Sequence, residues 1–158
     1  MDAAAEICAA LADDWLPSIY QTKIRTLRTR SIQIEVAERE NAAIIQHTLL
    51  GIELKVARHR FACPDLATAR YMRIFARIGC RSFAIPYDIT RISSLADELE
   101  TSWQRTLLEL DRLTTGRPGR SVSIVRSRLI GSVRAAVNEI GAGEVMPAFD
   151  RETRQRKT

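Results

Sequence analysis

Cysteine is scarce in this chain. The three cysteines, Cys8, Cys63 and Cys80, are an odd number and form no C-x-x-C pair. The sequence therefore indicates neither a disulfide framework nor a zinc site, because both need paired or closely spaced cysteines. We interpret all three as small buried hydrophobic residues, with a reactive thiol as the alternative.

Long apolar runs and a basic N-terminal segment are also absent. No stretch approaches the roughly 18 consecutive apolar residues that can span a membrane. The chain opens with Asp2 and Glu6, without the positive charge that begins a secretory signal. We therefore expect no membrane span, no secretory signal and a cytoplasmic location.

Lysine is rare as well, because 21 of the 24 basic residues are arginine. The net charge is +5, and the pI is near 9.6. The planar guanidinium of arginine suits phosphate better than the point charge of lysine, so this balance favours a nucleic-acid-binding protein. A GC-rich genome would produce the same excess of arginine, and composition alone does not separate the two explanations.

What the chain does contain is typical of one globular domain. It has 158 residues, of which 46% are hydrophobic and 27% charged. That length buries roughly two-thirds of the surface of the extended chain. We predict a single domain over residues 1–146 and a charged C-terminal tail over residues 147–158 that frays.

The stretch over residues 50–88 organises the predicted fold. Its first part has the two-residue apolar period of a half-buried strand, at Leu50, Ile52, Leu54 and Val56. A helix should follow from Pro64 to Ile78, because proline suits the first helical position and Gly79 can close a helix. Residues 82–85 read as a second strand. This order predicts a βαβ unit over about 50–86, with a parallel strand pair covered by the helix.

The flanking segments complete an α/β or α+β domain. We predict a helix at 2–14, a short helix at 18–30 and a strand at 32–36, whereas 42–49 fits either a strand or a helix. A long helix begins at Ser93 or Ser94 and ends near residue 114, and a last helix covers 121–140. The expected architecture is a small mixed sheet of three to four strands, flanked by the N-terminal helix, the crossover helix and two C-terminal helices.

The long helix over residues 93–114 carries a regular apolar stripe. Its members recur at steps of three and four residues: Ile92, Leu95, Leu99, Trp103, Thr106, Leu110 and Leu113. Such a stripe must be covered. We favour coverage by the rest of the chain, and the alternative is a subunit interface in a homodimer.

One group of residues could carry catalysis. Glu53 and Lys55 are two apart on the predicted strand, so both leave its polar face, and Glu35 occupies the polar face of the earlier strand. If those strands are neighbours, the three side chains converge. Two carboxylates can hold a divalent metal, and a nearby lysine can activate water or stabilise phosphate charge. The alternative is a set of solvated strand charges.

This E-x-K pattern on a strand, after an acidic residue and before a helix, resembles the PD-(D/E)XK nuclease superfamily over about residues 1–88. The resemblance implies Mg²⁺ or Mn²⁺ bound by Glu35 and Glu53, with Lys55 as the catalytic lysine. Glu38 is the alternative first acid, and Glu6 an additional ligand from the opening helix. These roles are expectations drawn from the resemblance.

A basic stripe runs along the predicted crossover helix. Arg70, Arg73 and Arg77 lie three and four residues apart on one face, and Arg58 and Arg60 precede the helix. We interpret them as a surface that follows nucleic-acid phosphates. The alternative is the ordinary wet face of a crossover helix.

The sequence thus predicts a protein that binds DNA or RNA, with metal-dependent phosphodiester hydrolysis, or a degenerate form of that site, as the candidate activity. The alternative is a non-enzymatic dimeric scaffold or regulatory protein that uses the long helix as its interface. Strongly salt-dependent binding would favour the first function, and concentration-dependent self-association the second.

Overall fold

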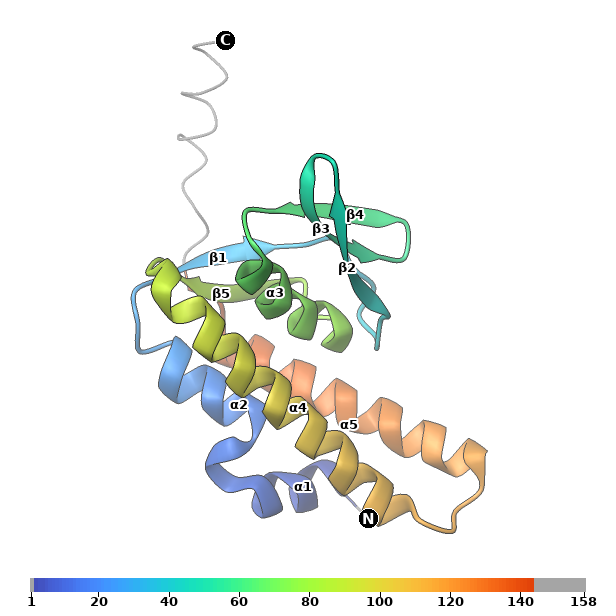
Figure 1. Ribbon diagram of the computed structural model, residues 1–158. Helices are drawn as coiled ribbons and strands as arrows, with labels where there is room; N and C mark the ends of the chain where they lie inside the picture. The colour runs from blue at the N-terminus through green and yellow to red at the C-terminus, as the bar shows by residue number, and fades with distance from the viewer. Residues whose placement is uncertain (1, 144–158) are drawn as a thin grey trace.

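The computed structural model describes residues 2–143 and combines helices with strands, which confirms the predicted class. In chain order the elements are α1 (Ala3–Leu11), η1 (Ala12–Asp14), α2 (Leu16–Ile19), η2 (Tyr20–Ile24), β1 (Thr29–Gln33), β2 (Ala43–Thr48), β3 (Gly51–Val56), β4 (His59–Cys63), α3 (Leu66–Ile78), β5 (Ser82–Pro86), η3 (Ile89–Arg91), α4 (Ile92–Thr114) and α5 (Gly119–Ile140). Figure 1 shows the β2–β3–β4 sheet at one end and α1, α2, α4 and α5 at the other. Helix α3 lies between them. The predicted tail at 147–158 falls outside the described residues.

Helix α3 begins after a capping aspartate and ends at a glycine. Asp65 is its N-cap and accepts a hydrogen bond from the Thr68 amide at 2.7 Å, so Pro64 precedes the helix instead of occupying its first position. Gly79 closes the helix in the left-handed conformation, as predicted, with φ +86°. A Cβ at this position would also collide with the Arg39 backbone. Only glycine fits there.

Helix α4 packs its apolar stripe inside the molecule. Leu95, Leu99 and Leu110 are buried, and Trp103 is only 4% exposed. The helix contacts α1, α2 and α3. The favoured interpretation of this stripe as intramolecular core is confirmed.

The strands form two separate antiparallel sheets, which corrects the predicted parallel βαβ pair. Among residues 2–143, strand β1 pairs only with β5, and β3 lies between β2 and β4. The strand, helix, strand order over 50–86 is present, but β3 and β5 are not neighbours. Both edges of β3 are hydrogen-bonded, one to β2 and the other to β4. A turn at Ala57 and Arg58 returns the chain as β4. Apolar alternation alone does not reveal this turn.

The second edge of β5 is closed by side chains. Its residue Ala84 donates its N–H to the Tyr20 hydroxyl at 2.9 Å and accepts at its carbonyl from the Tyr71 hydroxyl at 2.6 Å. A parallel neighbouring strand would have to form its own hydrogen bonds with this N–H and this carbonyl. Burial raises the pKa of both tyrosines, so the hydroxyls stay protonated and can donate.

Other boundaries also differ from the predictions. The helix expected over 18–30 ends at Ile24, because Thr29 already begins β1. The ambiguous segment 42–49 is the strand β2. Helices α4 and α5 begin at Ile92 and Gly119, slightly earlier than expected.

The described residues share one hydrophobic core, into which every helix from α1 to α5 and both sheets contribute. Its centre is aromatic: the rings of Phe75 and Phe83 stack with centroids 4.4 Å apart, and Tyr20 and Tyr71 pack against Phe75. No helix within residues 2–143 is long and apolar enough to cross a membrane.

Candidate functional site

The basic stripe of α3, formed by Arg70, Arg73 and Arg77, faces α4 instead of open solvent. The Arg70 guanidinium bonds Asp97 and contacts Glu100 at 3.0 and 3.2 Å. Arg73 reaches the same Glu100 at 3.4 Å. The side chains of Arg70 and Arg73 are each 23% exposed. Two of the three charges that the sequence assigns to phosphate are therefore already paired within the chain.

The electrostatics of the α3 stripe follow from this packing. The hydrogen bonds from Glu100, and then those from Asp97, raise the pKa of Arg70. Burial, and secondarily the neighbouring charge of Arg73, lowers the pKa of Arg77. For Arg77, the loss of hydration outweighs the attraction of the nearby carboxylates, so removing more water from its guanidinium would cost further free energy. The α3 stripe thus supports the contact between two helices.

A second set of cations lies on the three-stranded sheet. Lys55 of β3 stands directly opposite Arg60 of β4, and Arg58 lies in the turn that joins these strands. Arg58 and Arg60 are exposed and Lys55 is half-buried. Within residues 2–143 none of the three forms an ion pair. We call Lys55, Arg58 and Arg60 the sheet cations.

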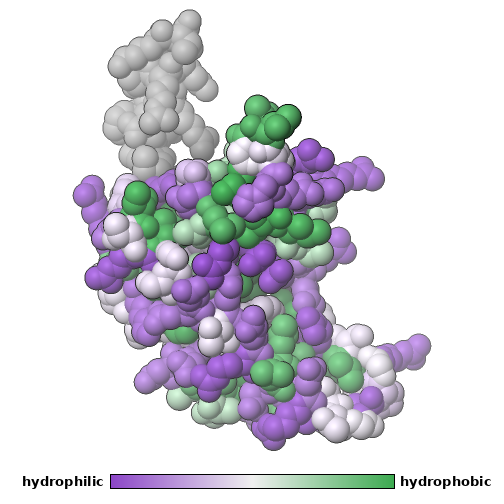
Figure 2. Space-filling model, in the orientation of Figure 1, coloured by the Kyte–Doolittle hydropathy of each residue, from purple (hydrophilic) through white to green (hydrophobic). Residues whose placement is uncertain are grey.

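The pairing of Lys55 with Arg60 places two like charges on one face. Directly opposed residues of antiparallel strands have Cβ atoms about 5 Å apart, and like charges there are destabilising. The third neighbour in this row is Ile44 of β2, which is 57% exposed and supplies no negative charge. Glu53 leaves the same face two residues from Lys55, but within residues 2–143 it forms no ion pair with either cation. This face therefore places two cations side by side without an ion-paired carboxylate. Figure 2 shows hydrophilic surface on this part of the molecule beside an apolar tip.

The two candidate metal ligands lie in different parts of the fold. Glu53 is in the middle of β3, half-buried, with its Oε1 atom enclosed and without a hydrogen-bond partner. Glu35 follows β1 and is exposed, in a shallow pocket that also includes Arg81 and Ser82. The strand pairing that would have brought them together does not exist, because β1 pairs with β5.

The remaining candidate acids do not complete a metal site either. Glu38 approaches Arg81 at 3.8 Å, and Glu6 is exposed on α1. In the part of the chain that the structure describes, no three His, Cys, Asp or Glu side chains gather as metal ligands would. The donors present do not fit a Mg²⁺ or Mn²⁺ site built from Glu35 and Glu53 together.

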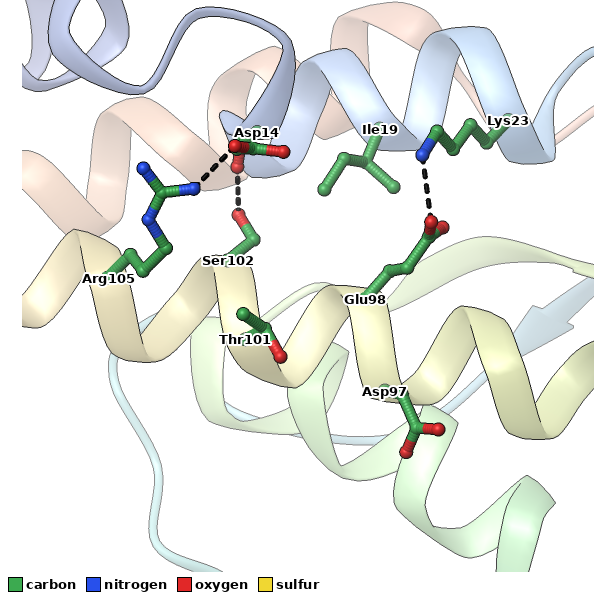
Figure 3. Close-up of a pocket in the computed structure, with 8 residues that line it drawn as sticks. All are labelled: Asp14, Ile19, Lys23, Asp97, Glu98, Thr101, Ser102 and Arg105. Atoms are coloured by element: carbon green, nitrogen blue, oxygen red, sulfur yellow. Dashed lines mark hydrogen bonds and ion pairs between the residues drawn. The ribbon is translucent and has the colours of Figure 1, made fainter.

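A cleft between the N-terminal helices and α4 offers another concave surface, drawn in Figure 3. Its carboxylates are occupied: Asp14 pairs with Arg105, and Glu98 accepts from Lys23 at 2.8 Å. Asp97 points away from the cleft, and it pairs with Arg70 of α3. These ion pairs tie α4 to its neighbours, and they leave no free acid and base facing each other.

The prediction of buried cysteines is confirmed for Cys63 and Cys80 and is met only partly at Cys8. Cys63 and Cys80 are buried, Cys8 is half-buried, and all three are free. Burial raises the pKa of Cys80 to about 12, so this thiol is protonated and unreactive at neutral pH.

Sequence reasoning missed one exposed feature, the turn between β2 and β3. Leu49 and Leu50 occupy this turn and are fully exposed. The sequence signal for this turn was weak, because a two-residue hairpin turn favours asparagine or glycine at its central positions, and these positions hold Leu49 and Leu50. It was obscured because Leu50 also fits the alternation of the following strand.

Comparisons of this chain with protein-family models, with curated proteins and with solved structures found no match. The resemblance to the PD-(D/E)XK superfamily therefore rests on the E-x-K residues alone and stays a prediction.

Proposed function

We propose that this protein binds nucleic acid through the sheet cations Lys55, Arg58 and Arg60. The observation that carries the proposal is the pair of Lys55 and Arg60, opposed on neighbouring strands, neither of which forms an ion pair with a carboxylate of residues 2–143. Two like charges at this distance repel each other, and a polyanion relieves the repulsion.

The contrast with the other arginines supports this choice. Arg70, Arg105 and Arg126 each meet a carboxylate of another element, so the fold neutralises charges that it needs for its own assembly. The sheet cations tie no elements together. Contacts of this kind reach phosphate oxygens and carry no base preference, so we expect binding that depends on salt more than on sequence.

Binding across a salt series tests the proposal. The triple variant Lys55→Ala, Arg58→Ala, Arg60→Ala should bind duplex DNA or RNA more weakly in fluorescence anisotropy. The slope of log K against log salt should fall by about 0.9 for each phosphate that the variant no longer neutralises. The matched control removes the same charge from exposed positions elsewhere: Arg91→Ala, Arg120→Ala and Arg128→Ala.

The control should keep most of the wild-type slope. The absence of binding by the wild type, or equal reductions of the slope in the two triple variants, would overturn the assignment to the sheet cations.

Metal-dependent or degenerate nuclease activity remains a separate prediction. What supports it is the enclosed, unpartnered Oε1 of Glu53 beside Lys55 on one strand. Since Glu35 does not join them, no hydrolytic step is assigned to this group. Incubation of supercoiled DNA with the protein and Mg²⁺ or Mn²⁺ tests it: nicking by the wild type and its loss in Glu53→Gln would support the hypothesis, and intact DNA would end it.

The scaffold alternative no longer has the surface on which it was based. The stripe of α4 is covered by the chain itself, with Trp103 and Leu110 buried. A homodimer joined through this helix would have to open the core. Light scattering over a range of protein concentrations measures whether the chain self-associates by another surface.

A further inference from the structure

The turn between β2 and β3 ends in two fully exposed leucines. Leu49 is 106% exposed and Leu50 99%, the highest values among the large hydrophobic residues described. Figure 1 shows the β2–β3 hairpin projecting from the body of the molecule, and Figure 2 shows an apolar group at its end. We call Leu49 and Leu50 the leucine tip. Scattered exposed leucines are ordinary, but an adjacent pair at a projecting end is not.

The fold does not need leucine at these positions. The turn is held by Thr48, whose hydroxyl donates to the Gly51 carbonyl at 3.0 Å and accepts from the Leu50 amide at 3.2 Å. Gly51 provides the positive φ of +125°, whereas neither leucine has a positive φ. Turn residues are normally small or polar, because they face water. The leucine tip is therefore presented by a hydrogen-bonded turn and is covered by nothing within residues 2–143.

We infer that the leucine tip is an apolar wedge that enters a base step of duplex DNA held by the sheet cations. This inference rests on the proposed function, because the same sheet supplies both features. Proteins that deform DNA insert leucine and similar side chains between base pairs, and the extra contacts of the bent duplex offset the unstacking. The preformed turn lets the wedge enter without first becoming ordered.

The spacing between tip and charge fits a duplex. Lys55 lies five residues from Leu50 along an extended strand, which is about 16 Å. A DNA groove is about 8 Å deep, and a wedge must pass its floor to reach the stacked bases. Lys55, with its long side chain, then stands near the phosphates that border the groove. Strand β4 ends opposite Ile52, so the part of the hairpin beyond Ile52 is a two-stranded ribbon, and strands of this kind enter the major or the minor groove of DNA.

A membrane surface fits this spacing less well. Interfacial apolar groups sink only about 5–10 Å, and the headgroup layer adds a few ångströms. Cations about 16 Å behind the tip would stand beyond that layer. The positions next to the leucines are Thr48 and Gly51, and neither carries a charge that could bind anionic headgroups.

The test separates unstacking from binding. Duplexes of about 25 base pairs carry 2-aminopurine beside a central TA step, which is easily deformed. Binding of the wild type should raise its fluorescence several-fold. The variant Leu49→Ser, Leu50→Ser should lose this rise while keeping the wild-type salt slope, and its affinity for the TA duplex should fall about tenfold. Leu108→Ser is the matched control, because Leu108 is an exposed leucine of α4, and it should behave as the wild type.

The outcomes distinguish the two proposals. If the wild type binds through the sheet cations but the 2-aminopurine signal stays flat, or is equal in the tip variant, the wedge is wrong and the proposed function stands. If the wild type binds no nucleic acid, both fail.

Two other results would reassign the tip and overturn the wedge. One is tip-dependent binding of phosphatidylserine vesicles without DNA unstacking. The other is a light-scattering mass that halves in the tip variant.

Discussion

Two basic regions of this protein differ in the spacing of their cations along the sequence and in what those cations contact in the structure. Arg70, Arg73 and Arg77 of α3 have regular helical spacing, and two of them pair with acids of α4. The sheet cations have no regular spacing, and within the described chain they pair with no acid. The more conspicuous pattern is thus the one that serves the fold. Whether a basic stripe is a binding surface can be judged only once the element that packs against it is known.

The difference originates in α4. Asp97 and Glu100 are three residues apart on that helix, so both project toward α3 and meet its arginines. Within residues 2–143, α3 is the helix that packs extensively against the three-stranded sheet, and on the charged face β2 places Ile44 beside Lys55. The two regions differ because acids of α4 pack against the α3 arginines, whereas the strand residues paired with Lys55 are uncharged or like-charged. The predictions below test this difference.

The largest expected effect comes from loosening α4. Trp103→Ala should lower the free energy of unfolding by about 3–5 kcal/mol, as large-to-small core truncations do. In molecules that stay folded, Arg70 and Arg73 should keep their ion pairs with α4, because the truncation removes none of these charges. Chemical denaturation measures the change, and light scattering should report the same mass as the wild type. A halved mass with intact helical circular dichroism would instead make α4 a subunit interface.

The second effect is a pH dependence that belongs to the packed region. The pKa of Cys80, next to the end of α3, is about 12 in the fold against about 9 when unfolded. Because the pKa of Cys80 is higher in the folded protein, the protonated thiol contributes its full stabilisation below pH 9. This contribution is lost as pH rises from 9 toward 12. Between pH 9 and 11 the loss is about 2 kcal/mol.

Denaturation of Cys80→Ala across this range provides the measurement. The variant should start from a lower stability and show a flatter decline than the wild type. Tyr20 and Tyr71, whose pKa values are also raised by burial, keep part of the decline above pH 10. Parallel curves for the two proteins would show that Cys80 does not titrate as its burial requires.

A smaller effect should distinguish the helix interface from an ordinary surface pair. Glu100→Gln removes the shared partner of Arg70 and Arg73 and should cost about 1–2 kcal/mol, since both guanidinium groups are largely buried. The control is Glu109→Gln, which breaks an exposed pair with Arg112 on the same helix. Such pairs contribute only a few tenths of a kcal/mol. Equal losses of stability would place the α3 arginines in the same class as surface ion pairs.

The smallest effect has the opposite sign. Lys55→Glu converts the like-charged pair with Arg60 into an attractive one and should raise stability by about 0.5 kcal/mol. The same variant should bind nucleic acid more weakly than Lys55→Gln, which removes the charge without reversing it. Stability would then improve as binding declines. If Lys55→Glu destabilises the chain, the repulsion that carries the proposed function is absent.

The pattern of the sequence was sufficient for elements whose signals are local. The stop at Gly79, the strand around Ile52 and Leu54 and the apolar stripe of α4 follow from backbone freedom and periodicity within a few residues. The acid at Glu53 and the lysine at Lys55 were also placed correctly on one strand face, since side chains two apart in a strand always share a face. Their convergence with Glu35 was a statement about strand neighbours, and periodicity carries no such information.

The sequence by itself therefore determined the helices α3, α4 and α5, the strand β3, the mixed class and the apolar side of these elements. Tertiary structure alone decided that β3 pairs with β2 and β4, because a turn at Ala57 returns the chain and the hydroxyls of Tyr20 and Tyr71 close the edge of β5. It also decided which cations remain unpaired. Charge pairing depends on elements about 30 residues apart in the chain, as Arg70 and Glu100 are, and such contacts exist only once the helices have packed.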